Sequence, residues 1–273
     1  MGNVHRIKSY EYLKAGGLNP IFVCHNTEQA DRLRSAFSVA DIVSLDIPVP
    51  EPGVNGFDRD ICEQVLFDMD DWYVSVDDNI THLSGLDPEL YKLSSLEPDP
   101  RFRAEFERVI DPKRLPSIFD EMIDNAESAG TSYAAFTKAK NYYFRLGKWQ
   151  SVGFACNAFC LKKRIGSPWY SRHFKCIADM AQSVMTVART GACLVNRFAR
   201  MEKTYHESGG IGSAEIRLPY RYATLNFLLD HFYGLIVEDT SELGIRFSRV
   251  KHWRSHTNVN EVLRKVDHAC REA

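Results

Sequence analysis

Strand-like and helix-like segments alternate over the first 80 residues, and this alternation restricts the fold more than any other feature. Short apolar runs typical of strands occupy 21–24, 41–48 and 71–80, and segments with helical periodicity occupy 27–37 and 55–69. Strand–helix–strand repeats of this length predict right-handed crossovers in a parallel α/β sheet. We therefore expect these three strands in one sheet, with Thr27 as the N-cap of the first helix.

The rest of the sequence continues the α/β pattern after an interruption. Residues 84–130 contain five prolines and two helical segments, which indicates a helical insertion. Further strands are expected at 132–141, 151–163 and 244–253, and amphipathic helices at 175–191 and 221–236. These lengths fit a single α/β domain over residues 1–273, with a mixed sheet, a helical insertion and a mostly helical C-terminal part.

Charge is strongly segregated along the chain although the formal net charge is only −2. Residues 41–127 carry 22 acidic and 7 basic side chains, whereas residues 131–175 carry 9 basic side chains, no acidic one and 11 aromatics. Basic side chains neutralise phosphates and aromatic rings stack on bases, so this tract favours a nucleic-acid surface. The alternative is that the aromatics form core and the basic groups form a solvated face.

Composition bears mainly on the cellular compartment. Seven cysteines without regular spacing indicate reduced thiols rather than a disulfide framework. No apolar run is long enough for a membrane helix, and the N-terminus lacks the apolar region of a secretory signal. These features predict a cytoplasmic protein with no membrane partner. Sequences typical of P-loop, dinucleotide-binding and serine-hydrolase sites are absent.

The strongest candidate site is Asp77-Asp78-Asn79, at the end of the third predicted strand. Ligands of open α/β sheets bind at the carboxyl ends of strands. Neighbouring carboxylates there favour a divalent cation bridged to a diphosphate. A strand-ending turn is the alternative, because Asp and Asn are common in turns.

Several segments together resemble a known family. The first 80 residues resemble the nucleotide-binding half of GT-A glycosyltransferases, in which a strand ends in a DXD-type metal motif. More specifically, the chain resembles the TET-associated glycosyltransferase family of phages. The resemblance spans about residues 19–215 and is carried by WYVSVDDNI (72–80), FACNAFCLKK (154–163), IADMAQSVMTVARTG (177–191) and YHESGGIG (205–212).

The resemblance implies a fold, a reaction and a set of ligands. It implies a GT-A-like (Rossmann-like) sheet with a nucleotide-sugar-binding half at about 19–80 and an acceptor-binding half at 131–273. The reaction would move a sugar from a nucleotide sugar, UDP-linked by resemblance, to the hydroxymethyl group of a modified pyrimidine in double-stranded DNA. Mg²⁺ or Mn²⁺ would be the cofactor.

Individual roles follow from the matched positions. Asp77, Asp78, Asn79 and His206 would hold the metal, and Asp77, Arg59, Gly209 and Gly210 would contact the donor. Asp179 would be the catalytic base, although a helix-surface aspartate is equally compatible with the sequence. The basic tract at 131–175 and a second acid-free basic stretch around Trp253, rather than matched positions, supply most of the expected acceptor and DNA contacts: Asn157, Lys162, Lys163, Arg164, Arg249, Lys251, Trp253 and Arg254.

Departures from the family pattern keep alternatives open. Asn79 replaces a common Asp, and Ala178 precedes Asp179 where related enzymes often have a second acid. These differences leave room for a non-catalytic DNA-binding protein. Transfer to a small-molecule or glycan acceptor is a further alternative.

Overall fold

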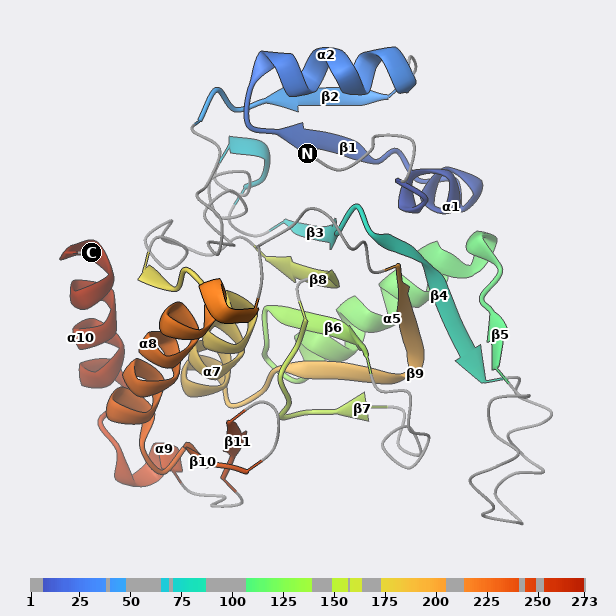
Figure 1. The fold of residues 1–273 in the computed structure, drawn as a ribbon. Helices are drawn as coiled ribbons and strands as arrows, with labels where there is room; N and C mark the ends of the chain where they lie inside the picture. Colours follow the sequence, from blue (N-terminus) through green and yellow to red (C-terminus); the bar gives the residue numbers. More distant parts are fainter. Residues whose placement is uncertain are drawn as a thin grey trace.

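The computed structural model describes a mixed α/β protein. The described residues are 7–37, 40–47, 65–68, 71–86, 107–138, 149–156, 158–163, 173–204, 214–240, 244–248 and 253–272. A curled mixed sheet is flanked by helices on both faces, and a small β–α–β unit lies at one end of the molecule (Figure 1).

The small unit contains the first two predicted strands and the helix between them. Strands β1 (Ile21–Cys24) and β2 (Asp41–Ser44) pair in parallel, and α2 (Thr27–Ala36) connects them. Cys24, Ala30 and Leu33 form its own small core. The helix is confirmed, but its N-cap is Asn26, whose side chain accepts a hydrogen bond from Gln29 N (3.0 Å). The prediction that Thr27 caps the helix is therefore wrong by one residue.

The third predicted strand, β3 (Trp72–Val76), belongs to a different sheet. The order of this seven-stranded sheet is β3-β8-β6-β9-β4-β5, with β7 paired to β9. Its other strands are β8 (Phe159–Lys163), β6 (Tyr133–Thr137), β9 (Leu194–Lys203), β4 (Ile80–Leu86), β5 (Glu107–Val109) and β7 (Trp149–Gln150). The expectation of one parallel sheet containing the first three strands is thus wrong, because β3 pairs antiparallel with β8.

A short turn forces the large sheet to curl. Only residues 77–79 separate β3 from β4, although three strands lie between them in the sheet. In a flat sheet these two strands would be about 19 Å apart, at about 4.8 Å per strand. The Cα atoms of Val76 and Ile80 can be at most about 14 Å apart even in an extended chain. The sheet must therefore bend so that β3 and β4 approach each other, and the turn crosses from one to the other at one end of the strands.

Each face of the sheet has its own core. On one face, α5 (Leu115–Ser128) packs with α1 (Ser9–Ala15) and the short helix η4 (Pro112–Arg114). On the other face lie α7 (Ala178–Thr190), α8 (Ala214–Phe232) and α10 (Val259–Glu272). The pair β10 (Ile236–Glu238) and β11 (Ile245–Phe247), with α9 (Trp253–His256), completes this second layer. In the described part of the chain, no helix is long and apolar enough to cross a membrane.

The predicted helical insertion is partly wrong. Residues 115–128 are helical as expected, but residues 80–86 and 107–109 are paired strands of the main sheet. The described part of 84–130 therefore extends the sheet. Strands β6, β8 and β11 and helices α7 and α8 form within or across the segments where strands and helices were expected. However, α8 begins at Ala214, Trp253 begins helix α9 instead of ending a strand, and strand β9 was not predicted.

A buried polar network fixes the far edge of the sheet. Arg200 donates two hydrogen bonds to Glu107 (3.0 and 2.8 Å) and forms an ion pair with Glu202. The Ser84 hydroxyl lies 2.9 Å from a carboxylate oxygen of each glutamate. Burial, the largest cause, and the Arg200 charge lower the pKa of the neighbouring His82, against the opposing effect of both carboxylates. Strands β4, β5 and β9 are thus joined by side chains as well as by backbone.

Candidate functional site

The candidate site lies at the edge where β3, β6 and β9 end. These strands run in the same direction, because β3 and β6 are both antiparallel to β8 and β6 is parallel to β9. Helix α7 leads directly into β9, so its first turn returns to this same edge. The sheet therefore brings the 77–79 turn and Asp179, about 100 residues apart in sequence, to one edge.

Backbone hydrogen bonds hold the 77–79 turn in place. Asp77 N donates to Ala158 O (2.8 Å), next to β8, and Thr204 N donates to Asn79 O (2.9 Å), after β9. Ile80 N closes the turn on Asp77 O (3.2 Å). The turn thus spans from β8 to β9 across the end of β6.

The side chains of this turn have different environments. The Asp77 carboxylate lies 3.4 Å from the Lys203 ammonium, with 19% of the Asp77 side chain and 27% of the Lys203 side chain exposed. Asp78 is exposed to solvent. Asn79 Oδ1 is buried and has no hydrogen-bond partner among the described residues. Two carboxylates and an orphaned amide oxygen are a ligand set that suits Mg²⁺ or Mn²⁺, but Lys203 already neutralises one of them.

Asp179 lies in the first turn of α7, after a strained residue. Ile177, the N-cap of the helix, has φ 53° and ψ 35°, which is the left-handed region. A β-branched side chain rarely adopts this conformation, and such strain is concentrated at functional sites. The Asp179 carboxylate accepts a hydrogen bond from Met180 N (3.0 Å) at the helix N-terminus, where the helix dipole favours negative charge.

Ala155, Cys156 and Ala158 lie between Asp179 and the turn. Ser183 Oγ donates to Asp179 O (2.7 Å) and accepts from Ala155 N (3.0 Å), so the first turn of α7 is attached to this segment. Burial and then the Asp179 charge raise the pKa of the Cys156 thiol, against a hydrogen bond and charge from Lys138. Because Ala158 bonds to Asp77, the two acidic groups flank the same short segment.

Most of the predicted DNA contacts that the structure describes lie elsewhere. Lys162 is only 1% exposed, and its ammonium lies 5.7 Å from the centre of the Tyr73 ring. Trp253 is 7% exposed and donates to Tyr233 O (3.1 Å). Both predictions need correction, because these buried side chains present no surface to a phosphate or a base.

Lys163 and Arg254 are placed away from the candidate edge. Lys163 lies at the opposite end of β8, 3.6 Å from Glu127 and 5.5 Å from the centre of the Trp72 ring. Arg254 is exposed and donates to Arg189 O (2.8 Å) in the last turn of α7. That turn is about 15 Å along the helix from Asp179. The other predicted site residues are outside the described residues: Arg59, Asn157, Arg164, His206, Gly209, Gly210, Arg249 and Lys251.

Sequence reasoning did not identify Lys203 and Lys138 as parts of this edge. Lys203 ends a strand that was not predicted, and Lys138 follows β6 inside the basic tract. Within the described part of the chain, no three His, Cys, Asp or Glu side chains form a group that could hold a metal ion. Comparison with protein families, curated proteins and solved structures finds no match to this chain. The function proposed below therefore rests on the geometry of this edge together with the sequence resemblance given above.

Proposed function

We propose that this protein is a GT-A-type glycosyltransferase that moves a sugar from a nucleotide sugar to a hydroxymethylpyrimidine in DNA. The observation that carries the proposal is the convergence of Asp77, Asp78 and Asn79 with Asp179 at the carboxyl edge of one sheet. The cation that accompanies a diphosphate needs carboxylate ligands, and the acceptor hydroxyl needs a carboxylate that can act as a base. This edge carries acidic side chains for both roles.

Asp179 would act as the general base. Its carboxylate would accept the proton of the acceptor hydroxyl as that oxygen attacks C1 of the sugar and the bond from C1 to the diphosphate breaks. The hydrogen bond from Met180 N holds this carboxylate, and the Ser183 bonds to Ala155 and to the Asp179 carbonyl hold the first turn of α7 in place. Removal of the proton during attack avoids a positively charged oxygen in the transition state.

Asp77 and Asp78 would hold the divalent cation, with Asn79 Oδ1 as a third oxygen. The bound ion, Mg²⁺ or Mn²⁺, supplies positive charge that stabilises the departing nucleoside diphosphate. Asn79 Oδ1 supports this assignment, because it is buried without a hydrogen-bond partner among the described residues and a bound cation would supply the partner that buried polar atoms normally have.

Mass analysis of modified DNA tests the proposal directly. The purified protein is incubated with Mn²⁺, a panel of nucleotide sugars and DNA containing hydroxymethylcytosine or hydroxymethyluracil, and the nucleosides are then weighed. The expected result is a hexose-sized mass increase with one of the donors. Failure of UDP and other nucleoside diphosphates to bind with any divalent metal would instead support a non-catalytic protein.

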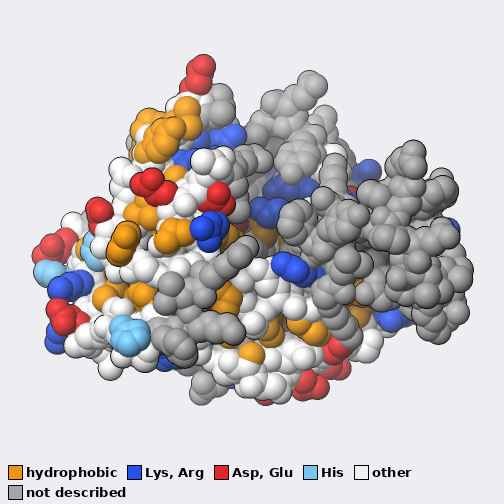
Figure 2. Space-filling view, turned by 90° about the horizontal axis from the view of Figure 1, so that it is seen from below, with side chains coloured by type: hydrophobic (Ala, Val, Ile, Leu, Met, Phe, Trp, Pro, Cys, Tyr) orange, Lys and Arg blue, Asp and Glu red, His pale blue; other side chains and the backbone are white. Residues whose placement is uncertain are grey.

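A basic and aromatic surface beside Asp179 supports DNA as the acceptor. The first half of α8 carries Arg217, Arg221 and the 59% exposed Tyr222, and Lys175 lies 5.7 Å from the Tyr220 ring. Thr224 Oγ1 donates to Cys176 O (3.0 Å), which fixes α8 close to the start of α7. Hydrophobic and basic side chains also lie next to each other in the view from below (Figure 2). Such a surface suits phosphates and an unstacked base.

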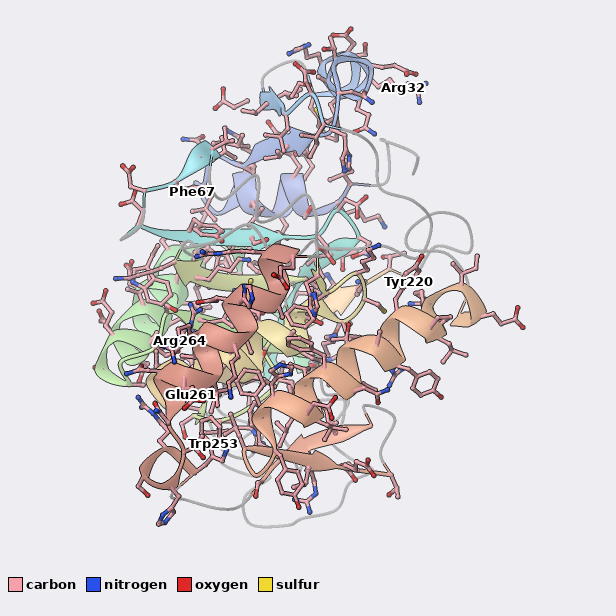
Figure 3. All side chains as sticks on the ribbon, turned by 90° about the vertical axis from the view of Figure 1, so that its left-hand side faces the viewer. Arg32, Phe67, Tyr220, Trp253, Glu261 and Arg264 are labelled. Atoms are coloured by element: carbon pink, nitrogen blue, oxygen red, sulfur yellow. The ribbon has the colours of Figure 1, made fainter. Side chains whose placement is uncertain are left out.

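The double substitution Arg217→Glu/Arg221→Glu should weaken DNA binding at least tenfold. Two phosphate contacts would be lost, so the plot of log affinity against log salt concentration should become less steep by about two units. Fluorescence anisotropy with a labelled duplex at several salt concentrations measures both effects. The control is Arg264→Glu/Arg271→Glu, which makes the same charge change on α10, away from Tyr220 (Figure 3). Equal losses in both variants would show only a general charge effect.

The burial of Lys162 and Trp253 favours a second candidate, transfer to a small-molecule or glycan acceptor. That reaction would use the same edge and the same Asp179. Donor-dependent nucleotide release without any change of DNA mass, together with a flat salt response in the anisotropy experiment, would identify it.

A further inference from the structure

We propose that Lys203 exchanges partners during donor binding: its ammonium holds Asp77 in the free protein and contacts the diphosphate once metal and nucleotide are bound. The inference rests on the proposed function, because it concerns the same donor site. It makes Lys203 a positioning residue. Lys203 competes with the metal for Asp77 in the free protein and contacts the diphosphate in the donor-bound protein.

The geometry of the pair suits an exchangeable contact. The Nζ to Oδ2 distance of 3.4 Å is longer than the usual charge-assisted hydrogen bond of about 2.7–2.9 Å. Both side chains are partly exposed, so water and a ligand can reach the pair. A ligand that offers a cation to the carboxylate and an anion to the ammonium can therefore replace this contact without leaving either charge unpaired.

The backbone of Lys203 is fixed while its side chain has freedom to move. Lys203 pairs with Ile80 in the β4–β9 register, and the next residue, Thr204, donates to Asn79 O (2.9 Å). The Cα atom therefore stays beside the turn. The flexible four-carbon stem lets the ammonium move from the carboxylate to a neighbouring anion.

Electrostatics give the exchange its direction. A divalent cation at Asp77 repels an ammonium held by the same carboxylate, so metal binding alone must displace Lys203. The diphosphate brings new negative charge next to the metal, and the displaced ammonium can then bind a phosphate oxygen. Lys203 should accordingly oppose the binding of metal alone and favour the binding of the metal–nucleotide.

The substitution Lys203→Met should change these two affinities in opposite directions. The affinity for Mn²⁺ alone should rise several-fold, because its competitor is gone. The affinity for UDP at saturating Mn²⁺ should fall about tenfold or more, because a charged hydrogen bond to phosphate is lost. The electron paramagnetic resonance signal of free Mn²⁺ measures the first affinity, and isothermal calorimetry with UDP measures the second.

Controls separate this role from structural support. Lys203→Arg keeps the charge and should bind UDP nearly as the wild type does, whereas Lys265→Met makes the same chemical change on the exposed side of α10 and should alter neither affinity. If Lys203→Met fails to fold, as judged by circular dichroism, Lys203→Gln provides the same comparison. Two unchanged affinities, or two that fall together, would overturn the proposal. If the wild type binds UDP with no metal at all, the proposed function fails as well.

Discussion

Replacing Asp179 with asparagine should lower kcat by about 10²- to 10⁴-fold, which is the usual contribution of a general base. The amide has nearly the same shape as the carboxylate but cannot accept the acceptor's proton. Binding of UDP and Mn²⁺ should remain within about twofold of the wild type, because Asp77 and Asp78 are untouched. Single-turnover kinetics with a saturating nucleotide sugar measure the first effect, and calorimetry measures the second.

Asp120→Asn is the matched control for this substitution. Asp120 is an exposed aspartate on α5, on the other face of the sheet, and its replacement should leave kcat unchanged. An Asp179→Asn protein with wild-type kcat would remove Asp179 from the mechanism.

Replacing Arg200 with methionine should destabilise the protein by about 3–5 kcal/mol. Arg200 is 11% exposed on its side chain and is the cation between Glu107 and Glu202. Without it, two largely buried carboxylates that lie close together lose the cation that they share. Urea denaturation followed by circular dichroism measures the change in the free energy of unfolding.

The exposed Arg34→Met variant is the comparison for Arg200. Its ion pair with Asp31 is well exposed, so the loss should be within about 1 kcal/mol. The triple variant Arg200→Met/Glu107→Gln/Glu202→Gln should recover much of the stability, because no buried charge remains. A single Arg200→Met variant as stable as the wild type would show that the network has no role in holding β5 and β9 to β4.

The sequence predicts the local elements well where one physical signal dominates. A strand at 72–76 and a helix at 178–190 form where the sequence predicts them, so Asp77 was located at a strand end. Asp179 lies in the first helical turn because the helix begins at Ala178, three residues after the predicted start. Their position at one edge follows from sheet topology, which sequence periodicity does not contain. In the same way, Asn26 and Thr27 are adjacent residues that can both cap a helix, and only the observed hydrogen bond decides between them.

The missed features have physical reasons. Strand β9 contains Asn, two Arg, Glu and Lys, and a register shift interrupts its pairing with β6, so its side chains do not alternate cleanly. Lys162 and Lys163 are neighbours with the same chemistry, yet the first is buried within a strand covered on both faces and the second, at the end of that strand, is partly exposed. A lysine inside a sheet beside Tyr73 looks identical in sequence to one at the surface.

The turn that joins β3 to β4 also determines how the molecule can open. It links two strands, β3 and β4, that are separated by three others in the bent sheet. These strands cannot move apart without breaking the hydrogen bonds of the turn to Ala158 and Thr204. A nucleotide bound at this turn would add its binding energy to these hydrogen bonds. Separation of β3 and β8 from β4 and β9 would then also require the nucleotide to dissociate. The force needed to separate these strands would therefore be highest in the donor-bound protein.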